Sequence, residues 1–288
     1  MVRRLQGCWI DSIYRARVVG QLAGQGRTTR RCLWCHCQAT GQQHDISHAD
    51  VVVVTKKLHR GLAEALRGKL WLFDAVDFYP QPLCTTWGKD QAVSWVKDQI
   101  AQYSPTAVIW PNQRMMNDCG GDIPDIVIRH HHRPNIQRNP IRENVAVVGY
   151  EGSIKYLGRW GHALRDECQA RGWELRTNPK ALSELDIVVA FRDAPFNGYA
   201  QRHWKSNVKL ANAHGSGTPF IGPREDGYIE TASGLELWTN EPGGLRDAFD
   251  RLTGRHHREQ VQKGFIANSI TVQECAHKLT AFIDTLHV

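Results

Sequence analysis

The sequence predicts an α/β protein with two domains, each a doubly wound parallel sheet. Its 288 residues are enough for two domains of roughly 150 residues each, and a hydrophobic content of 41% is typical of a globular chain. Short runs rich in β-branched residues alternate with segments of helical period in both halves of the chain. Apolar strands separated by amphipathic helices indicate parallel sheets that are covered on both faces.

Short apolar runs bounded by polar or turn-forming residues predict the strands. In the first half they are Val51–Thr55, Leu70–Phe78, Ala107–Trp110 and Asp125–Arg129. In the second half they are Val145–Gly149, Glu174–Arg176, Asp186–Phe191, Pro219–Gly222 and Leu235–Thr239.

Apolar residues at three- and four-residue spacing predict the helices between these strands. Two stripes in the first half are Leu58, Leu62, Ala65 and Leu66, and Val93, Val96, Ile100 and Tyr103. A third is Ile154, Leu157, Trp160, Leu164 and Cys168. A final stripe predicts a C-terminal helix that packs across the two domains; it comprises Val272, Cys275, Ala276, Leu279, Phe282, Ile283 and Leu286.

The segment RPNIQRNPIR, residues 133–142, predicts a linker, because it holds two prolines and two asparagines and shows no periodicity. We therefore expect a Rossmann-like N-terminal domain over 1–132, a second such domain over 143–271 and a crossover helix over 272–288. In parallel-sheet domains ligands bind at the carboxyl ends of the strands, so two facing domains predict a shared cleft.

Several classes of protein and site are disfavoured. The longest apolar run, around residues 51–54, is far below the roughly 20 residues that span a bilayer, and no leader sequence is evident, so we expect a soluble cytoplasmic protein. No G-x-G-x-x-G follows the first strand of either half, and no P-loop motif is present. The cluster Cys32–Cys37 has spacing seen in zinc and haem-attachment sites, but a short strand in a reducing compartment is the favoured interpretation.

The most informative segment is 204–222. Lys205, Lys209 and Asn212 are spaced for one face of a helix, and Arg192 follows a predicted strand toward the same cleft. Lysines four residues apart repel each other unless an anion lies between them or water screens both. Three converging cations favour a diphosphate clamp; on spacing alone, a solvated lysine face with a glycine stop is an equally open interpretation.

A family resemblance extends over this segment. The run from Lys205 to Ile221, K-x-x-x-K-L-x-N-A-x-x-x-G-x-P-x-I, followed by Tyr-Ile-Glu at 228–230, resembles the nucleotide-sugar-binding domain of GT-B-fold glycosyltransferases. Segments 12–17 and 74–82 are similar to first-domain segments of small bacterial and phage members. The resemblance implies a GT-B fold and a nucleotide sugar, UDP-linked, as donor.

The resemblance also implies roles for individual residues in the donor site. Cationic side chains would neutralise the departing diphosphate, Asn212 and Glu230 would bind hydroxyls of the ribose or the donor sugar, and Gly217 would let the backbone approach the nucleotide. The donor-binding residues implied are Arg192, Lys205, Lys209, Asn212, Gly217, Tyr228 and Glu230.

Residues that differ from the family pattern bear on the stereochemistry of the transfer, and a missing motif bears on the need for a metal ion. Asn212 and Trp204 stand where many retaining members carry glutamates, which favours inversion. No D-x-D motif is evident, and we expect no metal ion or other cofactor.

An inverting transfer needs a carboxylate that accepts the proton of the acceptor hydroxyl, and the resemblance places it in the first domain. The candidates are Asp77 and Asp74, near the end of a predicted strand, and Asp45 in the loop 42–48. Asp77 is preferred because Pro80 and Pro82 force a loop directly after it. A helix cap or a turn is the ordinary alternative for such aspartates.

Basic residues gather near the N-terminus: residues 1–31 contain seven arginines and one acid, Asp11. Arginine suits bidentate contacts with phosphate, and the chain resembles, in size and charge, small phage GT-B enzymes that glycosylate hydroxymethylated pyrimidines in DNA. We therefore expect 5-hydroxymethylcytosine in duplex DNA as acceptor, reached by base flipping in the bacterial host cell. The expected contacts are Arg15, Arg17, Arg27, Arg30, Arg31, His131 and His132.

Other functions stay open at this point. The same chemistry could act on a glycan, a lipid-linked or a small-molecule acceptor, or the cleft could belong to a non-enzymatic protein that binds a phosphorylated ligand. The sequence does not indicate an oligomeric state.

Overall fold

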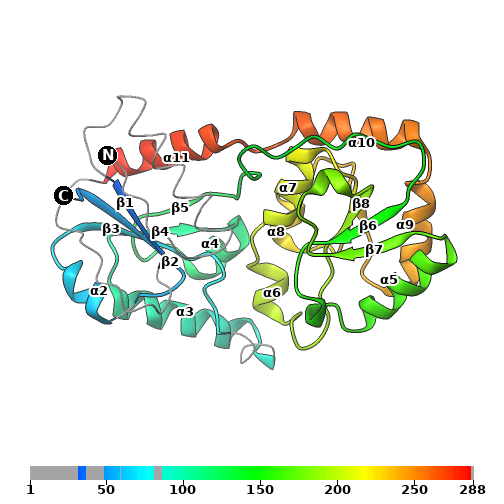
Figure 1. Ribbon diagram of the computed structural model, residues 1–288. Coiled ribbons are helices and arrows are strands. Elements are labelled where there is room, and N and C mark those ends of the chain that lie inside the picture. Colours follow the sequence, from blue (N-terminus) through cyan, green and yellow to red (C-terminus); the bar gives the residue numbers. More distant parts are fainter. Residues whose placement is uncertain (1–31, 37–48, 59, 81–85, 287–288) are drawn as a thin grey trace.

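The computed structural model describes residues 32–36, 49–58, 60–80 and 86–286. Two domains lie side by side, and each is built on a parallel sheet with helices against it (Figure 1). The predicted α/β architecture of two parallel sheets is confirmed. Within the described ranges, no helix is long and apolar enough to cross a membrane.

The N-terminal sheet has its strands in sequential order, β1 to β5, all parallel. Since right-handed crossovers that proceed in one direction place their helices on one face, α2, α3 and α4 pack together against Val52, Phe73 and Val108. The alternate residues Val51 and Leu72 face the other side. The elements are β1 (Cys32–His36), β2 (Val51–Thr55), α2 (Arg60–Ala65), β3 (Leu70–Asp74), α3 (Lys89–Tyr103), β4 (Ala107–Trp110), α4 (Gln113–Cys119) and β5 (Asp125–Val127).

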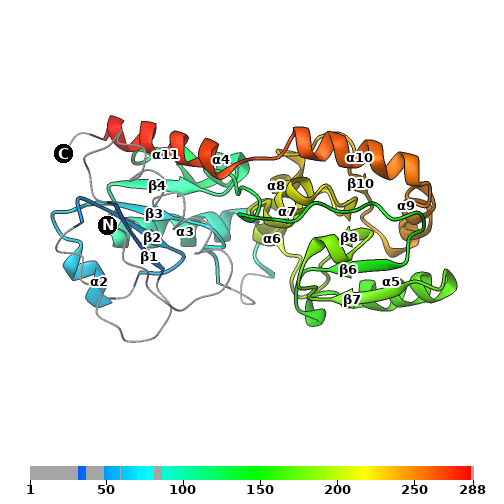
Figure 2. The same ribbon diagram turned by 45° about the horizontal axis from the view of Figure 1, so that its top comes forward.

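The second face of this sheet is covered by the C-terminal helix, α11 (Val272–Thr285), which returns from the other domain (Figures 1 and 2). Leu279 and Ile283 of its predicted apolar stripe pack in one cluster with Val51 and Leu72. The helix begins with a capping box of Thr271 and Glu274. The stripe is therefore buried on the first domain, whereas the preceding helix, α10 (Arg255–Ala267), packs on the second.

The C-terminal sheet is doubly wound, with strand order β10-β9-β8-β6-β7. One face packs on α5 and α9 and the other on α7, α8 and α10. The chain moves outward from β6 to β7, then returns to β8 on the other side of β6, which creates a reversal of strand order. The elements are β6 (Val147–Tyr150), α5 (Arg159–Ala170), β7 (Glu174–Thr177), β8 (Ile187–Val189), α6 (Tyr199–His203), α7 (Val208–Ser216), β9 (Phe220–Gly222), α8 (Asp226–Ile229), β10 (Leu237–Trp238) and α9 (Leu245–Arg251).

Several strand ends are shifted by one or two residues from the predicted bounds, and three local predictions differ from the structure by more than that. β3 ends at Asp74 rather than at residue 78, and Ile154 lies in a 3₁₀ turn before α5 with 54% of its surface exposed. Lys205 precedes α7, which begins at Val208, so it does not share a helical face with Lys209. The reason is that contacts with the first domain keep residues 204–207 from continuing the helix toward the N-terminus.

These contacts fix the segment before α7 to the first domain. The side chain of Asn207 both accepts from the backbone N–H of His130, at 2.9 Å, and donates to its carbonyl, at 3.1 Å. Asn112 donates to the backbone carbonyls of His203 and Lys205 at 3.0 and 2.9 Å. With its backbone groups engaged in this way, Lys205 has a position defined by both domains.

Candidate active site

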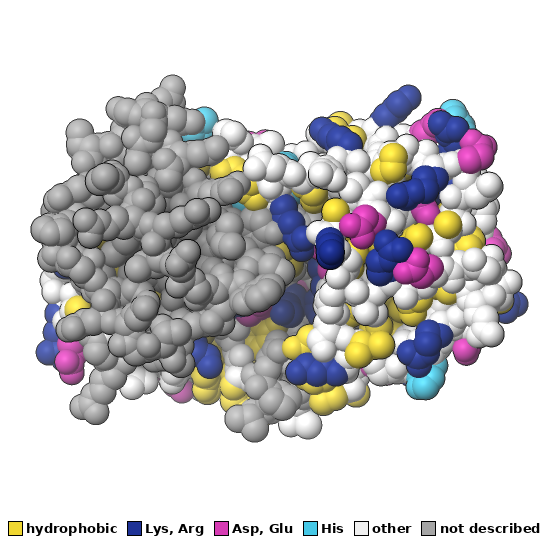
Figure 3. Space-filling view, viewed as in Figure 1, with side chains coloured by type: hydrophobic (Ala, Val, Ile, Leu, Met, Phe, Trp, Pro, Cys, Tyr) yellow, Lys and Arg dark blue, Asp and Glu magenta, His cyan; other side chains and the backbone are white. Residues whose placement is uncertain are grey.

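The candidate site lies where the strand order of the second sheet reverses. β6 and β8 are neighbours there, and such a reversal opens a crevice at the carboxyl ends of the strands. A cavity of about 140 Å³ occupies this place, and Figure 3 shows Lys and Arg side chains along the boundary between the domains. It is lined by Asp77, Glu151, Gly152, Tyr156, Arg192, Phe196, Lys205, Ser206, Val208, Lys209 and Tyr228.

The structure thus brings together four of the implied donor residues and the preferred base. The cavity volume is close to that of an engineered cavity that holds benzene and below the range of about 300–1,000 Å³ for whole-ligand pockets. A cavity of this size fits the charged part of a ligand, with the remainder lying outside it.

Arg192 is buried, and its charge is balanced by a carboxylate. Its guanidinium donates to both oxygens of Glu225, at 3.0 and 3.1 Å, and to the hydroxyl oxygen of Tyr228 at 3.5 Å. Burial opposes the charged form, but Glu225 outweighs this effect and raises the pKa of Arg192 above its usual range. Arg192 therefore stays charged and forms a fixed pair.

The positive charge of Lys209 is not balanced by a carboxylate of the described residues as that of Arg192 is. Its Nζ lies 4.3 Å from the centre of the Tyr150 ring, and no carboxylate among the described residues lies at ion-pair distance from it. Burial lowers the pKa of Lys209 to about 7, and repulsion from Arg192 adds to this effect, although Glu151 and Glu225 oppose it. An anion entering the cavity would restore the proton.

Asp77 connects the two domains through ion pairs. Its Oδ1 lies 2.7 Å from Nζ of Lys205, and its Oδ2 lies 3.4 Å from Nζ of Lys56. Burial opposes ionisation, but Lys205 and then Lys56 outweigh it and hold the pKa of Asp77 well below its usual range. While these contacts last, Asp77 is ionised and is a weak proton acceptor.

The backbone at this ion pair is strained. Lys56, with φ of 68°, and Asp77, with φ of 52°, both adopt left-handed conformations that are unfavourable for residues with a Cβ atom. They follow the neighbouring strands β2 and β3. Such conformations gather at functional sites, where the surrounding structure enforces them, and here the Asp77 side chain reaches Lys205 of the second domain.

Glu151 is a cavity residue that the sequence motifs do not reveal. It directly follows β6, and only 9% of its side chain is exposed. Its Oε1 accepts from Arg133 at 2.6 Å, while its Oε2 is buried with no hydrogen-bond partner. Burial raises the pKa of Glu151, although Arg133, Lys209 and a side-chain interaction with Asn212 oppose that shift.

Lys56 and Glu225 were also missed. Lys56 directly follows β2, and Glu225 lies three residues after the end of β9. A search of the predicted strands for charged residues just past their carboxyl ends would have found both, together with Glu151.

Two implied donor residues do not line the cavity. Asn212 is buried, and its side-chain oxygen accepts from the backbone N–H of Arg133 at 3.0 Å. Gly217 ends α7 with φ of 69°, and a Cβ there would lie 2.6 Å from Gln262. Their positions explain the local fold, and their roles in ligand binding stay predictions.

Glu230 also lies away from the cavity. Its carboxylate accepts from the backbone N–H groups of Gln113 and Arg114, at 2.8 and 3.0 Å, where α4 begins, and lies 3.4 Å from Arg129. A carboxylate at a helix N-terminus is favoured by the free N–H groups and the helix dipole. In this structure Glu230 therefore joins the two domains.

The remaining predicted residues lie elsewhere. Asp74 is buried in the first domain and accepts from the Thr55 hydroxyl at 3.2 Å. His131 and His132 lie in the connection between the domains, where each ring Nδ1 is within 2.8 Å of the next residue's carbonyl oxygen. Outside the described residues lie Asp45, Arg15, Arg17, Arg27, Arg30 and Arg31.

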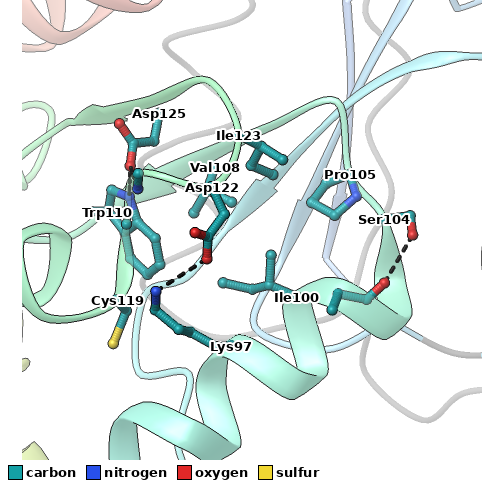
Figure 4. A pocket seen from close by; sticks show the side chains of 13 residues that line it. Lys97, Ile100, Ser104, Pro105, Val108, Trp110, Cys119, Asp122, Ile123 and Asp125 are labelled. Atoms are coloured by element: carbon teal, nitrogen blue, oxygen red, sulfur yellow. Dashed lines mark hydrogen bonds and ion pairs between the residues drawn. The ribbon is translucent and has the colours of Figure 1, made fainter.

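A second cavity, of about 280 Å³, lies in the first domain (Figure 4). Lys97 and Asp122 form an ion pair of 3.1 Å beside it, and Trp110 donates to Asp125 at 3.0 Å. Its walls come largely from residues that precede β4 and β5, which is the opposite end of the sheet from the one where parallel-sheet domains bind ligands. The first cavity is therefore the candidate active site.

Metal ligands do not gather in the described part of the chain: no group of three or more His, Cys, Asp or Glu residues there could hold an ion. The expectation of metal-independent chemistry stays a prediction.

The chain resembles known proteins in structure but matches none of them in the sequence comparisons. No protein-family model matches the chain, and no curated protein matches it in sequence. Anabaena HepE, solved with UDP and glucose, matches with a TM-score of 0.57 and 12% identity, over 83% of this chain and 79% of its own. AviGT4, a glycosyltransferase involved in avilamycin A biosynthesis, gives 0.51 and 13%, over 83% and 74%. The chain has the GT-B fold.

A third GT-B structure covers almost the whole of both chains. It is the UDP-GlcNAc 2-epimerase from Neisseria meningitidis bound to UDP-GlcNAc, with a TM-score of 0.52 and 10% identity, over 95% of this chain and 96% of its own. At these identities the similarity establishes the GT-B fold, and the activity has to be argued from the cavity itself.

Proposed function

We propose that this GT-B chain binds a UDP-sugar and transfers the sugar to a hydroxyl group of an acceptor. The observation that carries the proposal is Lys209, which lines the cavity beside Arg192 and Lys205 and lacks an ion-pair partner among the described residues. Such a site is complementary to a diphosphate. The UDP bound in the HepE structure supports UDP as the nucleotide.

Sugar transfer breaks the bond between the anomeric carbon and an oxygen of the β-phosphate, through a state that resembles an oxocarbenium ion. Negative charge develops on the departing diphosphate, and Lys205 and Lys209 stabilise it more strongly in the transition state than in the bound donor. Arg192, already neutralised by Glu225, positions the ligand rather than adding net charge.

Asp77 is the proton acceptor in this scheme. In the free protein Lys205 depresses its pKa more than Lys56 or Arg192 does; when the diphosphate draws Lys205 away, Asp77 loses its strongest cationic partner and becomes a stronger base. The acceptor hydroxyl gives its proton to Asp77 as its oxygen attacks the anomeric carbon opposite the leaving diphosphate, which inverts the configuration. The scheme uses no metal ion.

The donor site is tested by calorimetric titration of UDP into wild-type and Lys209→Met protein. Loss of one charge-assisted contact should weaken UDP binding about tenfold or more. Lys263→Met, at an exposed position of α10, is the matched control and should leave the affinity unchanged. Equal UDP affinity in Lys209→Met and wild type would contradict the proposal.

For the acceptor we propose 5-hydroxymethylcytosine in duplex DNA. The support comes from the sequence: the seven arginines among residues 1–31 suit contacts with DNA phosphates. The test is mass spectrometry of nucleosides from hydroxymethylated and unmodified DNA after incubation with UDP-sugars. Transfer to a glycan, lipid-linked or small-molecule acceptor, and not to DNA, would contradict the proposed DNA acceptor. UDP binding without any transfer would indicate a non-enzymatic binding protein.

A second candidate function is epimerisation of a UDP-sugar. It is favoured by the 95% and 96% coverage between this chain and the UDP-GlcNAc 2-epimerase. The two functions differ in their need for an acceptor. A change in the sugar of UDP-GlcNAc without acceptor would support the epimerase, whereas release of UDP that depends on acceptor would support the transferase.

A further inference from the structure

Glu151 has a carboxylate oxygen that makes no hydrogen bond of ordinary length with the protein, although the side chain of Asn212 is near enough to lower the pKa of the carboxyl. The side chain lines the cavity, Oε1 accepts from Arg133 at 2.6 Å, and Oε2 is buried without a hydrogen bond. Leaving a buried acceptor unpaired is unfavourable, so such a group in a cavity wall indicates a missing hydrogen-bond donor. Oε2 has almost no accessible surface, so a ligand hydroxyl reaches it only when the side chain turns toward the cavity that it lines.

The charge of Glu151 is out of place in a site that only binds an anion. Lys205 and Lys209 attract a diphosphate, whereas the Glu151 carboxylate, which is paired with Arg133, offers an anion no favourable contact. The carboxylate therefore has to serve a different part of the ligand, one that carries hydrogen-bond donors and no negative charge. Hydroxyl groups meet both conditions.

The connectivity of the ligand places such hydroxyls close to the diphosphate. In a nucleoside diphosphate sugar the donor sugar is attached to the β-phosphate, and the ribose is attached to the α-phosphate through its C5 carbon. Glu151 is near enough to Lys209 to affect the charge of that amine. A diphosphate held at Lys209 therefore brings sugar hydroxyls toward Glu151.

We propose that Glu151 binds a sugar hydroxyl of the donor, accepting its proton in a hydrogen bond through the carboxylate oxygen that Arg133 leaves unused. This inference rests on the proposed function, since it assumes that the cations hold a nucleoside diphosphate sugar. The hydroxyl belongs either to the donor sugar or to the ribose, and the experiment separates these two sources.

The test compares wild-type and Glu151→Gln protein in calorimetric titrations with inorganic pyrophosphate, UDP, and the UDP-sugar that the wild type binds most tightly among UDP-glucose, UDP-galactose and UDP-N-acetylglucosamine. In Glu151→Gln the amide oxygen can still accept from Arg133, which leaves an NH₂ donor where the acceptor oxygen was. Glu241→Gln, whose side chain is 72% exposed, is the matched control.

We expect Glu151→Gln to bind pyrophosphate as tightly as wild type or more tightly, because the carboxylate offers an anion no favourable contact that could be lost. If the hydroxyl is that of the donor sugar, affinity for the UDP-sugar falls about tenfold while that for UDP does not. If it is that of the ribose, UDP and UDP-sugar both weaken about tenfold.

Two results would overturn the inference while the proposed function stands. One is unchanged affinity for all three ligands in Glu151→Gln; the other is an equal loss for all three, pyrophosphate included, which a merely structural carboxylate would produce. Failure of the wild type to bind pyrophosphate or UDP would instead remove the proposed function, and this inference with it.

Discussion

Lys209 and Asp77 line one cavity but have their charges balanced in opposite ways. Asp77 contacts Lys205 and Lys56, whereas Lys209 contacts the face of Tyr150 and no carboxylate at ion-pair distance in the described part of the chain. Their pKa values are both depressed, so the free site holds an ionised acid and a partly neutral amine. A diphosphate would change both, because it supplies the anion that Lys209 lacks and competes with Asp77 for Lys205.

The first prediction at the residue scale concerns the pH dependence of UDP binding. Burial lowers the pKa of Lys209 to about 7 in the free protein, and a bound diphosphate would raise it. Above pH 7 the free amine loses its proton and binding must take one up, so UDP affinity should fall as pH rises, by up to about tenfold per unit. Below pH 7 this residue contributes no dependence.

Calorimetry between pH 7 and 9, in buffers of different ionisation enthalpy, measures both the affinity and the proton uptake. In this range the diphosphate of UDP is almost entirely ionised, since phosphate monoesters have a second pKa near 6. Lys209→Met should show neither effect. A wild-type affinity that is flat over this range would show that Lys209 does not gain a proton on binding.

The second residue-scale prediction separates binding from catalysis at Asp77. Asp77→Asn removes the carboxylate that competes for Lys205, so UDP should bind several-fold more tightly. Loss of the base should lower turnover by about 10²–10⁴. Steady-state kinetics with calorimetry show whether kcat falls while donor affinity rises.

Asp74→Asn is the control, because Asp74 is buried against Thr55 and does not line the cavity. It should leave UDP affinity unchanged. Full turnover in Asp77→Asn would mean that the proton acceptor lies elsewhere.

At the scale of elements, α6 belongs to the second half of the chain but packs into the first domain. Trp204, directly after α6, is completely buried in the first domain's hydrophobic cluster, and its Nε1 donates to Asp118 at 2.9 Å. Asp118 also accepts from Tyr199 at 2.8 Å and pairs with Lys89 at 2.9 Å. This shared carboxylate anchors the segment that leads directly to Lys205.

The prediction at this scale is a graded loss of stability. Trp204→Phe keeps an aromatic ring but removes one donor to Asp118, which should cost about 1 kcal/mol. Trp204→Ala leaves a cavity in addition and should cost about 3–5 kcal/mol. Urea denaturation followed by circular dichroism measures both, and equal costs for the two variants would mean that the hydrogen bond, and not the packing, anchors the segment.

The strands were predictable because their apolar runs are continuous. β2, β4 and β9 have the predicted bounds almost to the residue, since every residue in them is buried and polar residues or prolines mark their ends. The start of α7 was not predictable, because Asn207 lacks a side-chain capping bond and its amide is used by His130, 77 residues away in the sequence.

The site was predictable only in part, because contacts between residues far apart in the sequence also shape it. Spacing and resemblance pointed to Lys205, Lys209 and Arg192, which do meet in the cavity. The sequence could not show that Glu225 neutralises Arg192, or that Glu230 contacts the start of α4, 117 residues away. Such long-range pairs depend on how the two domains meet, which no local pattern encodes.

At the scale of the whole molecule, the chain crosses between the domains more than once. After α10 packs on the second domain, α11 returns and covers the free face of the first sheet (Figure 1). The first domain's apolar face is therefore buried only when the last helix is in place. The folding of the two domains is coupled through this crossover, together with the cross-domain contacts of α6 and Glu230.

The distribution of charge gives the last prediction. The formal net charge is +7, and residues 1–31 hold seven arginines against one aspartate, so the rest of the chain is nearly neutral. If DNA is the acceptor, these arginines should supply most of the phosphate contacts. Replacing Arg15, Arg17, Arg27, Arg30 and Arg31 together by glutamine should flatten the dependence of DNA affinity on salt, because each lost contact removes about 0.9 from the slope of log K against log salt.

This variant should bind UDP as the wild type does, since the donor cavity is built from other residues. Fluorescence anisotropy with a labelled duplex at several salt concentrations measures the slope. An unchanged slope would place DNA contacts outside the N-terminal arginines. No measurable DNA binding by the wild type at low salt would favour a glycan, lipid-linked or small-molecule acceptor. The proposal for the UDP-sugar site would be unaffected, because that site and the N-terminal arginines are independent sources of positive charge.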